Sequence, residues 1–314
     1  MTDPFRKEQY LMLALDPIHI GTGGYRLGRV DNTIIREPGT NLPKVPGTSL
    51  SGALRSFMAM QNKNKYPSCA GQGQEDEKTK EIRHCGEATC PVCMSFGFSY
   101  SRNSFQGLVQ LSDAYLLFFP VYSRLGPVWI TSPAALETAG FNGFQTGDNE
   151  VKTVSSLKEK AKGKLNLGWL MLPVAEEEFE IPKKLDDKDK IPESILNRAV
   201  LVSDSLFSHI VNDNLEVRTS VAIDPDTGAA ADKALFTYEA IPRTAVLQFY
   251  ATITEPQLFK VPPENKKPDF NIDKLSANLS KASEYLQWLG IGGMNTRGMG
   301  RMRTLARLEA GKNE

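Results

Sequence analysis

The sequence has no net charge, no long apolar stretch and few histidines. Its 314 residues include 37 Lys and Arg against 37 Asp and Glu, and only 3 His. The basic balance that is usual in nucleic-acid-binding proteins is therefore missing. No stretch approaches the ~20 apolar residues of a membrane-spanning helix, and the N-terminus lacks the apolar core of a secretory signal. We therefore expect a cytoplasmic protein with no membrane partner.

The neutral total conceals two segments of opposite charge. Residues 290–314 contain five basic and two acidic residues, whereas residues 175–193 contain eight acidic residues and four lysines. Any surface that binds phosphate groups is therefore predicted to be a local groove and not a broad basic face. We assign no function to the acidic segment.

The apolar pattern predicts one mixed α+β domain over residues 1–314, because strand-like and helix-like segments are interleaved without a regular βαβ repeat. Strands are expected at residues 10–15, 30–36, 108–121, 246–254 and 302–308. Helices are expected at residues 48–58, 194–211 and 271–289. Three insertions are also expected: a Cys-rich segment at 61–95, a charged loop at 140–193, and a β-hairpin at 214–241 around the turn Asp224-Pro225-Asp226-Thr227-Gly228.

A glycine-rich segment near the C-terminus is the first candidate site. Residues 290–301 contain five glycines together with Arg297 and Arg301. Glycines let a backbone approach a ligand closely, and consecutive amides can form a concave site for an anion. The alternative is a tight turn between a helix and a strand. The spacing differs from GxxxxGK[ST], so a nucleotide P-loop is not expected.

A second glycine-rich segment, Gly21-Thr22-Gly23-Gly24, follows the first expected strand. The helix that begins near Thr48 offers free backbone amides and the hydroxyls of Thr48, Ser49 and Ser51, which would suit a phosphate group. The alternative is ordinary capping of the helix by Thr48 or Ser49. Both readings remain open from the sequence.

The four cysteines are all located in the 61–95 insertion, at Cys69, Cys85, Cys90 and Cys93. The Cys90–Cys93 spacing of two intervening residues is typical of zinc sites, and the other two cysteines can complete a tetrahedron. His84 is a spare ligand. A site closed by four protein ligands would have a structural role. Disulfides and redox chemistry are the alternatives.

Asp31 lies between the two N-terminal segments. An aspartate there is usually a turn former, but a carboxylate beside a phosphate groove could also hold a metal ion or take a proton. The three histidines, His19, His84 and His209, are scattered and are each expected to be structural.

The order of these segments resembles the RAMP superfamily of CRISPR-associated proteins, and within it the crRNA-binding backbone subunits of type III-B (Cmr) effector complexes. The type III-A backbone subunits share the same motifs. The segments that carry the resemblance are His19–Gly23, Val30–Glu37, Leu42–Arg55, Phe119–Ser123, Trp129–Pro133 and Gly290–Arg301.

The resemblance implies a ferredoxin-like, RRM-related core and a subunit that forms a helical filament with copies of itself along a crRNA, together with other type III subunits. The hairpin would be the thumb that separates guide and target RNA. Asp31 would be the catalytic residue for Mg²⁺- or Mn²⁺-dependent cleavage of the target RNA at regular intervals. The residues implied in RNA binding are His19, Gly21, Thr22, Gly23, Lys44, Thr48, Ser49, Ser51, Arg55, Gly292, Gly293, Asn295, Thr296, Arg297 and Arg301.

The sequence departs from the family at two positions. Ser51 stands where members often have lysine, and Lys44 where they often have a bulky apolar residue, so a phosphate contact is expected to move to Lys44 or Arg55. Two other functions remain open. One is an RNA scaffold in which Asp31 is inert. The other is a RAMP endonuclease that processes precursor crRNA with His19 as the general base.

Overall fold

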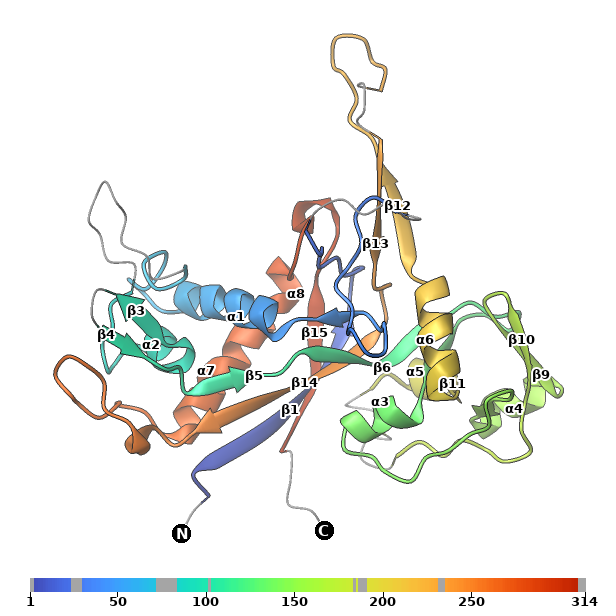
Figure 1. The fold of residues 1–314 in the computed structure, drawn as a ribbon, viewed down its shortest axis with the longest axis horizontal. Helices are drawn as coiled ribbons and strands as arrows, with labels where there is room; N and C mark the ends of the chain where they lie inside the picture. Colours follow the sequence, from blue (N-terminus) through green and yellow to red (C-terminus); the bar gives the residue numbers. More distant parts are fainter. Residues whose placement is uncertain are drawn as a thin grey trace.

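The computed structural model describes residues 3–23, 30–71, 84–100, 103–182, 185, 191–230 and 235–309. A large mixed sheet runs through the molecule, in the order β15-β1-β14-β6-β7-β11-β8, with β2 and β5 paired beside it (Figure 1). The α+β prediction is confirmed. The sheet's strands are β1 (Phe5–Ala14), β2 (Lys44–Val45), β5 (Val109–Leu111), β6 (Ala114–Val121), β7 (Val128–Thr131), β8 (Lys152–Thr153), β11 (Ala199–Leu201), β14 (Val246–Thr254) and β15 (Met302–Glu309).

Strand β1 lies between β15, at one edge of the sheet, and β14. It pairs antiparallel with β14 from Phe5↔Thr254 to Leu13↔Val246, and with β15 along its other edge. Every residue from Glu8 to Ala14 is buried, so this strand is covered on both faces. That burial explains why the sequence shows a continuous apolar run there and not an alternating pattern. The predicted strands at 10–15, 108–121, 246–254 and 302–308 are confirmed.

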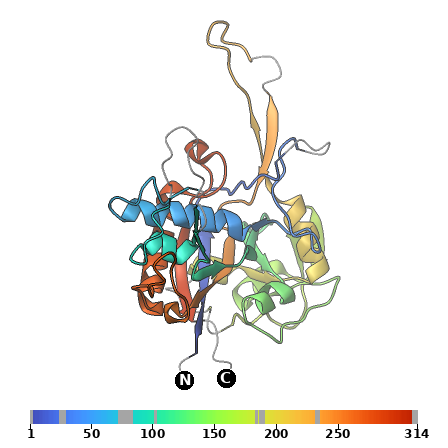
Figure 2. The ribbon, with the colours of Figure 1, turned by 60° about the vertical axis from the view of Figure 1, so that its left-hand side comes forward.

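Two helices cover the same part of the sheet. Helix α1 (Gly47–Gln61) packs against α7 (Ile272–Glu284), and α7 is followed by the short α8 (Leu286–Leu289) (Figures 1 and 2). Leu50 and Leu54 of α1 and Leu275 and Leu279 of α7 are fully buried at helical spacing. The helices predicted at 48–58 and 271–289 are therefore confirmed.

The prediction of a charged loop over residues 140–193 is wrong for residues 152–173, whereas residues 140–150 and 175–182 contain no helix or strand. After α3 (Pro133–Thr138), the chain forms β8, α4 (Ser155–Ala161) and the antiparallel pair β9 (Lys164–Leu167) and β10 (Leu170–Pro173). Leu157, Leu165 and Leu167 are buried, and these short apolar groups are too sparse to be recognised in a charged sequence. Residues 183, 184 and 186–190 lie outside the described residues.

Two other predicted elements differ from the structure. The helix expected at 194–211 is divided into α5 (Glu193–Leu196), β11 and α6 (Asp204–Asp213), because β11 enters the sheet beside β7 and Ser203 then caps α6. The strand expected at 30–36 is an irregular segment that makes only single bridges, among them Gly21↔Ile34 and Asn32↔Tyr238.

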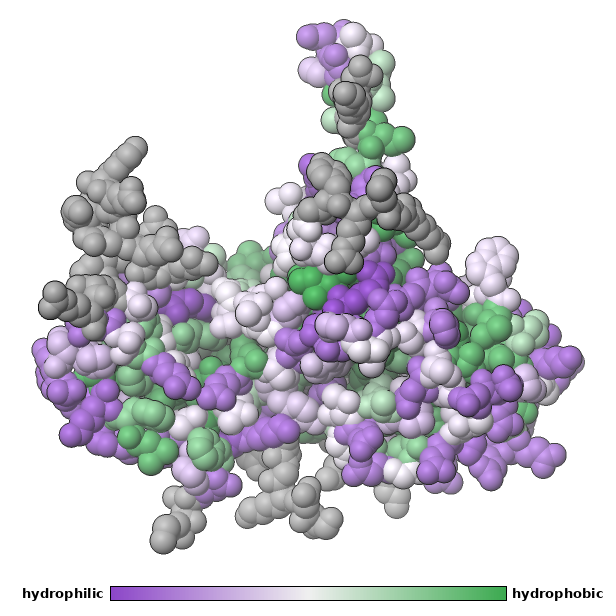
Figure 3. All heavy atoms as spheres, viewed as in Figure 1, coloured by the Kyte–Doolittle hydropathy of each residue, from purple (hydrophilic) through white to green (hydrophobic). Residues whose placement is uncertain are grey.

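A β-hairpin projects from the body of the molecule (Figures 1 and 2). It consists of β12 (Glu216–Ser220) and β13 (Phe236–Ala240), which pair antiparallel from Glu216↔Ala240 to Ser220↔Phe236. The predicted hairpin is confirmed, with residues 231–234 outside the described part. Its apolar side chains are unusually exposed, including Val217, Ile223 and Leu235 at 43%, 57% and 68% (Figure 3).

The Cys-rich insertion contains α2 (Pro91–Phe96) and leads into the small pair β3 (Phe98–Tyr100) and β4 (Asn103–Phe105). Two 3₁₀ turns, η1 (Pro256–Leu258) and η2 (Asn295–Arg297), flank α7 and α8 in the sequence. Within the described residues, no helix is both long and apolar enough to cross a bilayer.

Candidate nucleic-acid interface

The C-terminal glycine-rich segment contacts the residues immediately before the N-terminal one, Pro17–Ile20, although more than 260 residues separate the two segments. The Gly293 amide donates to the His19 carbonyl at 3.0 Å, and the Gly300 amide donates to the Pro17 carbonyl at 2.8 Å. A Cβ on Gly292 would lie 2.5 Å from the His19 carbonyl oxygen. The chain thus brings both candidate phosphate-binding segments to one place, at the foot of the hairpin (Figure 1). Gly24 lies outside the described residues.

The glycines of the C-terminal segment have two kinds of surroundings. Gly300 has φ +88° and its Cβ would lie 2.2 Å from the Ile291 carbonyl oxygen, so only glycine fits there. Gly293 has a negative or extended φ, and the nearest contact of a Cβ would be the His19 ring at 3.6 Å. Gly292 and Gly300 therefore serve close packing of the backbone, whereas Gly293 leaves its outer side open to a ligand.

The arginines of this segment also differ. Arg301 is bound by Asp16, with Nε 2.5 Å and Nη2 3.0 Å from the two carboxylate oxygens. The hydrogen bonds from Arg301 hold the pKa of Asp16 below its usual value. Thr296 and Arg297 are exposed, while Asn295 donates its side-chain amide to the Leu289 carbonyl at 2.6 Å. Arg297 is consequently the arginine of this segment that is better placed to meet a phosphate group.

On the N-terminal side, Thr22 and Gly23 are exposed beside Gly21. Gly21 bridges to Ile34, and the Thr22 amide donates to the Thr33 carbonyl at 3.1 Å, with the two threonine hydroxyls also 3.1 Å apart. The segment that carries Asp31 is therefore held against the first glycine-rich segment.

The beginning of helix α1 already holds an anion from the protein itself. The Gly47 amide donates to Asp113 Oδ1 at 2.7 Å, and Lys44 Nζ lies 2.6 Å from both Asp113 and Glu37. Burial opposes ionisation of Asp113, but the bonds from Lys44 and Gly47 still hold its pKa below the usual value. The expectation that Thr48 or Ser49 caps this helix is wrong: its N-cap is Pro46, with no side-chain cap bond. The Thr48 side chain is exposed, while Ser49 and Ser51 are half-buried.

Arg55 faces the Cys-rich insertion and is half-buried. Its Nε donates to the Cys69 carbonyl at 2.8 Å and its Nη1 to the Gly97 carbonyl at 2.9 Å. Burial lowers the pKa of its guanidinium group. These contacts connect α1 to the insertion and direct the Arg55 charge into the protein.

The four cysteines form a compact cluster whose sulfur atoms all lie within 4.8 Å of one another. Cys93 Sγ is 3.8 Å from the sulfurs of both Cys69 and Cys85. A tetrahedral zinc–thiolate site with bonds of ~2.3 Å has sulfur atoms about 3.8 Å apart. The four thiols could therefore bind a metal ion. His84 is not part of this cluster, because its Nε2 donates to the Gly71 carbonyl at 2.8 Å.

Asp31 is exposed and is attached to the hairpin. Its Oδ2 accepts hydrogen bonds from the Thr237 amide at 2.7 Å and from the Thr237 hydroxyl at 2.9 Å. The bond from the Thr237 amide, followed by that from the hydroxyl, holds the pKa of Asp31 below its ordinary value. Asp31 is thus an ionised carboxylate at neutral pH, positioned by the strand β13.

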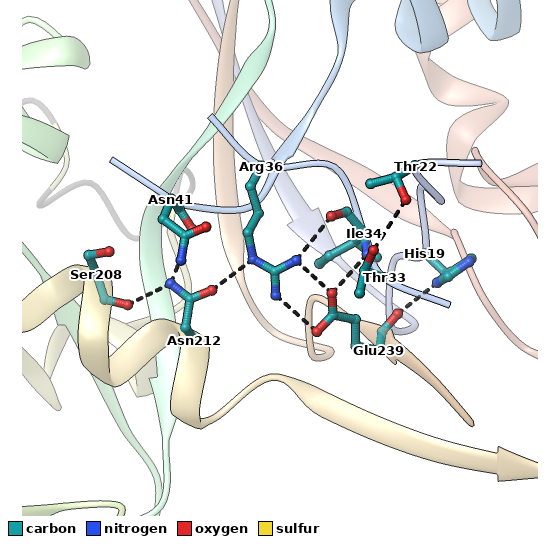
Figure 4. Close-up of polar contacts among 9 residues, drawn as sticks. All are labelled: His19, Thr22, Thr33, Ile34, Arg36, Asn41, Ser208, Asn212 and Glu239. Carbon is teal, nitrogen blue, oxygen red and sulfur yellow. Dashed lines mark hydrogen bonds and ion pairs between the residues drawn. The ribbon is translucent and has the colours of Figure 1, made fainter. Parts of the chain in front are cut away.

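A polar network beneath Asp31 was not predicted from the sequence (Figure 4). Glu239 of β13 binds Arg36 through both carboxylate oxygens at 2.6 and 2.9 Å, and its carbonyl accepts from His19 Nδ1 at 2.7 Å. The His19 ring is 6% exposed. One sequence signal was available. Glu239 stands between Tyr238 and Ala240 in a strand-like run, and a charged residue buried in such a run requires an oppositely charged or hydrogen-bonding partner.

Residues 12–303 match the family model of the RAMP superfamily. The chain belongs to the RAMP superfamily. Among curated proteins, this RAMP chain is similar to the Cmr endoribonuclease Cmr4 of Pyrococcus furiosus, with 29% identity over 92% of each chain. It is also 40% identical to the Csm3 endoribonuclease of Enterococcus italicus, over 32% of this chain and 42% of that protein.

Solved structures share the RAMP fold of this chain. A chain of the type III-B Cmr-beta complex bound to cognate target RNA superposes with a TM-score of 0.63 at 16% identity, covering 95% of this chain and 97% of that one. A crystal structure of Cmr4 superposes with a TM-score of 0.59 at 20% identity, covering 97% and 99%. At these identities the likeness concerns the fold.

Proposed function

We propose that this chain is a crRNA-binding backbone subunit of a type III CRISPR complex, of the type III-B kind, and that it cleaves target RNA. The observation that carries the proposal is the meeting of both glycine-rich segments, Asp31 and the foot of the hairpin in one region. The similarity to Cmr4 over 92% of each chain supports it. Other copies of the chain, further type III subunits, crRNA and target RNA are the partners that this function requires.

The strand order β15-β1-β14-β6, with α1 after β1 and α7 before β15, supports a ferredoxin-like core. The projecting hairpin, with exposed apolar side chains, suits a thumb that inserts between guide and target strands. The faces of stacked base pairs are apolar. Apolar side chains can therefore insert between them and displace a base pair, as charged side chains would not.

The RNA surface that we propose is narrower than the set implied by family resemblance. It keeps the exposed Thr22, Gly23, Gly293, Thr296 and Arg297. It leaves out three cations that the protein itself engages, namely Lys44 by two carboxylates, Arg55 by backbone carbonyls and Arg301 by Asp16. A cation that already has a carboxylate partner adds little attraction for phosphate.

For cleavage, the attacking group would be the ribose 2′-hydroxyl beside the scissile phosphate, brought into line by the displaced base. A general base works best with a pKa near the operating pH, whereas the pKa of Asp31 is held below its usual value. Asp31 therefore suits the role of a metal ligand better than that of a proton acceptor. A divalent ion such as Mg²⁺ or Mn²⁺ would supply positive charge at the phosphate.

The experiment is target-RNA cleavage by the assembled complex containing Asp31→Asn. We expect cutting at regular intervals to fall by at least about 100-fold, the upper end of the effect of losing an outer-shell partner of a metal ligand, with crRNA binding unchanged. The control is Asp269→Asn, which changes an exposed aspartate in the loop between η1 and α7. If cutting persists at the same positions in Asp31→Asn, the chain is a scaffold with an inert Asp31.

The processing of precursor crRNA by His19 has less support. The His19 ring is buried and its Nδ1 donates to the Glu239 carbonyl, so the residue already has a structural role. Cleavage of precursor RNA by the isolated chain, lost in His19→Ala, would favour that alternative over the proposed function.

We also infer that the cysteine cluster holds a structural zinc ion. Four sulfur atoms within 4.8 Å of one another, two pairs of them 3.8 Å apart, match the ligand set of a closed zinc site. Such a site would leave no position for a substrate.

A further inference from the structure

We propose that the Arg36–Glu239 ion pair is a positioning device that fixes Asp31 against the hairpin and thereby sets the rate of target cleavage. The inference rests on the proposed function, in which Asp31 takes part in cutting. It assigns a role to two residues that do not touch RNA in that function. The proposal depends on where the pair lies, on its burial and on the contacts that lead from it to Asp31.

Glu239 bonds to three segments of the chain at once. Its Oε1 accepts from the Ile34 amide at 2.9 Å and from Arg36 at 2.6 Å, while its Oε2 accepts from Arg36 at 2.9 Å. The Glu239 backbone accepts from His19, which in turn accepts from Gly293. One residue of the hairpin therefore connects both glycine-rich segments and the segment that carries Asp31 (Figure 4).

The contacts between residues 31–34 and 237–239 form a continuous ladder. Asp31 is bound by Thr237, the Asn32 amide donates to the Thr237 carbonyl at 3.0 Å, and the Glu239 amide donates to the Asn32 carbonyl at 3.2 Å. The Ile34 amide then donates to the Glu239 side chain. The segment is not a regular strand, so these bonds, together with those between Thr22 and Thr33, fix where Asp31 lies.

The ion pair is the charged part of this ladder and is largely shielded from solvent. The side chains of Arg36 and Glu239 are 20% and 9% exposed, so solvent weakens their attraction little. Arg36 also donates through Nε to Asn212 of α6 at 2.9 Å, which ties the pair to the body of the protein. Asp31 itself lies at the exposed end, and among the described residues its side chain is bonded by Thr237.

The charged groups of Arg36 and Glu239 are both engaged within the protein and are not expected to contact RNA. Both oxygens of Glu239 accept hydrogen bonds, and the Nε, Nη1 and Nη2 atoms of Arg36 all donate within the protein. A loss of the pair should therefore change the geometry at Asp31 and leave phosphate binding at Arg297 intact. That separation of effects makes the proposal testable.

The test uses Glu239→Gln in the complete complex. Glutamine keeps the shape and an acceptor for the Ile34 amide but removes the charge that holds Arg36. We expect the cleavage rate at saturating RNA and metal to fall about tenfold to 100-fold, the size of effect that follows from slight misplacement of a reacting group. The crRNA affinity and the spacing of the cuts should stay within about twofold, since they depend on phosphate contacts elsewhere.

Two further variants complete the design. Arg36→Gln should reproduce the defect, and the double variant should be no worse than either single one, because both remove the same interaction. Glu216→Gln is the matched control: it removes the Glu216–Arg218 pair, also 2.6 Å long and on the same hairpin, which is not part of the ladder. Wild-type cleavage by Glu239→Gln, or an equal defect in Glu216→Gln, would overturn the proposal.

A second measurement separates this proposal from the proposed function. Hydrogen exchange of the Asn32, Ile34 and Thr237 amides, measured on the full chain, should be faster in Glu239→Gln and unchanged in Glu216→Gln. Unchanged exchange in Glu239→Gln would refute the positioning role of the ion pair even if cleavage were impaired. If the wild-type complex does not cut RNA, the proposed function fails, while exchange still reports whether the pair holds the Asp31 segment.

Discussion

Single residues in the candidate interface divide into those that shape the backbone and those that face outward. Gly300 accommodates the Ile291 carbonyl at a distance that no side chain would allow, whereas Gly293 lies open on its outer side. Arg301 is bound by Asp16, whereas Arg297 is exposed. The same residue type thus has different roles within a segment of twelve residues.

The two glycines provide a matched pair of substitutions. Gly300→Ala should lower the free energy of unfolding by more than about 1 kcal/mol, since the site combines a positive φ with a backbone clash. Gly293→Ala should change it by less than about 0.5 kcal/mol, as for an ordinary surface position, yet weaken RNA binding because the methyl group would project into the proposed groove. Denaturant unfolding and RNA titration of both variants measure these effects. Equal effects of the two variants on stability would contradict the division of roles.

Among the elements, the Cys-rich insertion is held by polar contacts in addition to apolar side chains in the core, such as Val92 and Met94. Arg55 of α1 binds backbone carbonyls on both sides of the cluster, at Cys69 and Gly97. Helix α2 begins at Cys90, whose sulfur accepts from the Cys93 amide. A metal ion at the four sulfurs would connect the Cys69 and Cys85 segments to α2. The regular structure described in and after this insertion consists of α2 and the short strands β3 and β4.

We expect the purified chain to contain about one equivalent of zinc, because a closed site of four thiolates binds it tightly. Cys85→Ser should lose most of the metal and lower the melting temperature by several degrees. Ser68→Ala, an exposed position in the same insertion, is the control. Metal analysis measures the zinc content of the wild type and both variants, and thermal unfolding measures their melting temperatures. A metal-free wild-type chain whose melting temperature is unaffected by a chelator would eliminate the zinc site.

At the scale of the whole molecule, charge is distributed so that a neutral chain can still bind RNA locally. Some basic side chains, such as Lys44 and Arg301, form ion pairs with carboxylates of the protein itself. The remaining exposed charges then decide the affinity for phosphate. The surface offered to RNA should accordingly involve few ionic contacts per subunit and gain strength by repetition along a filament.

Arg297→Ala should reduce RNA affinity by a similar factor for every guide sequence and lower the slope of log affinity against log salt by about one unit. Lys260→Ala, at an exposed position just after η1, should leave both unchanged. Titrations at several salt concentrations with two unrelated guides measure the slope. A loss that depends on the guide sequence would contradict backbone recognition.

The sequence by itself predicted the elements with strong patterns. The buried strands at β1 and β14, the amphipathic α7 and the hairpin around Asp224–Gly228 follow from apolar runs, helical spacing and turn residues. It failed where short elements gain stability from distant partners. The strands β8 and β11 join the sheet edge, and Ser203 interrupts the expected helix. Two or three residues carry too little local preference to reveal such elements.

For the site, the sequence determined which residue types were available: two glycine-rich segments, four cysteines at zinc-like spacing, and Asp31 between the first glycine-rich segment and α1. Only the tertiary structure decided which of them are free. Asp113 reaches the start of α1 from 66 residues away, and Asp16 binds Arg301 across 285 residues. Ion pairs form through space and leave no local pattern in the sequence. The same reason conceals the Arg36–Glu239 pair, whose partners lie 203 residues apart.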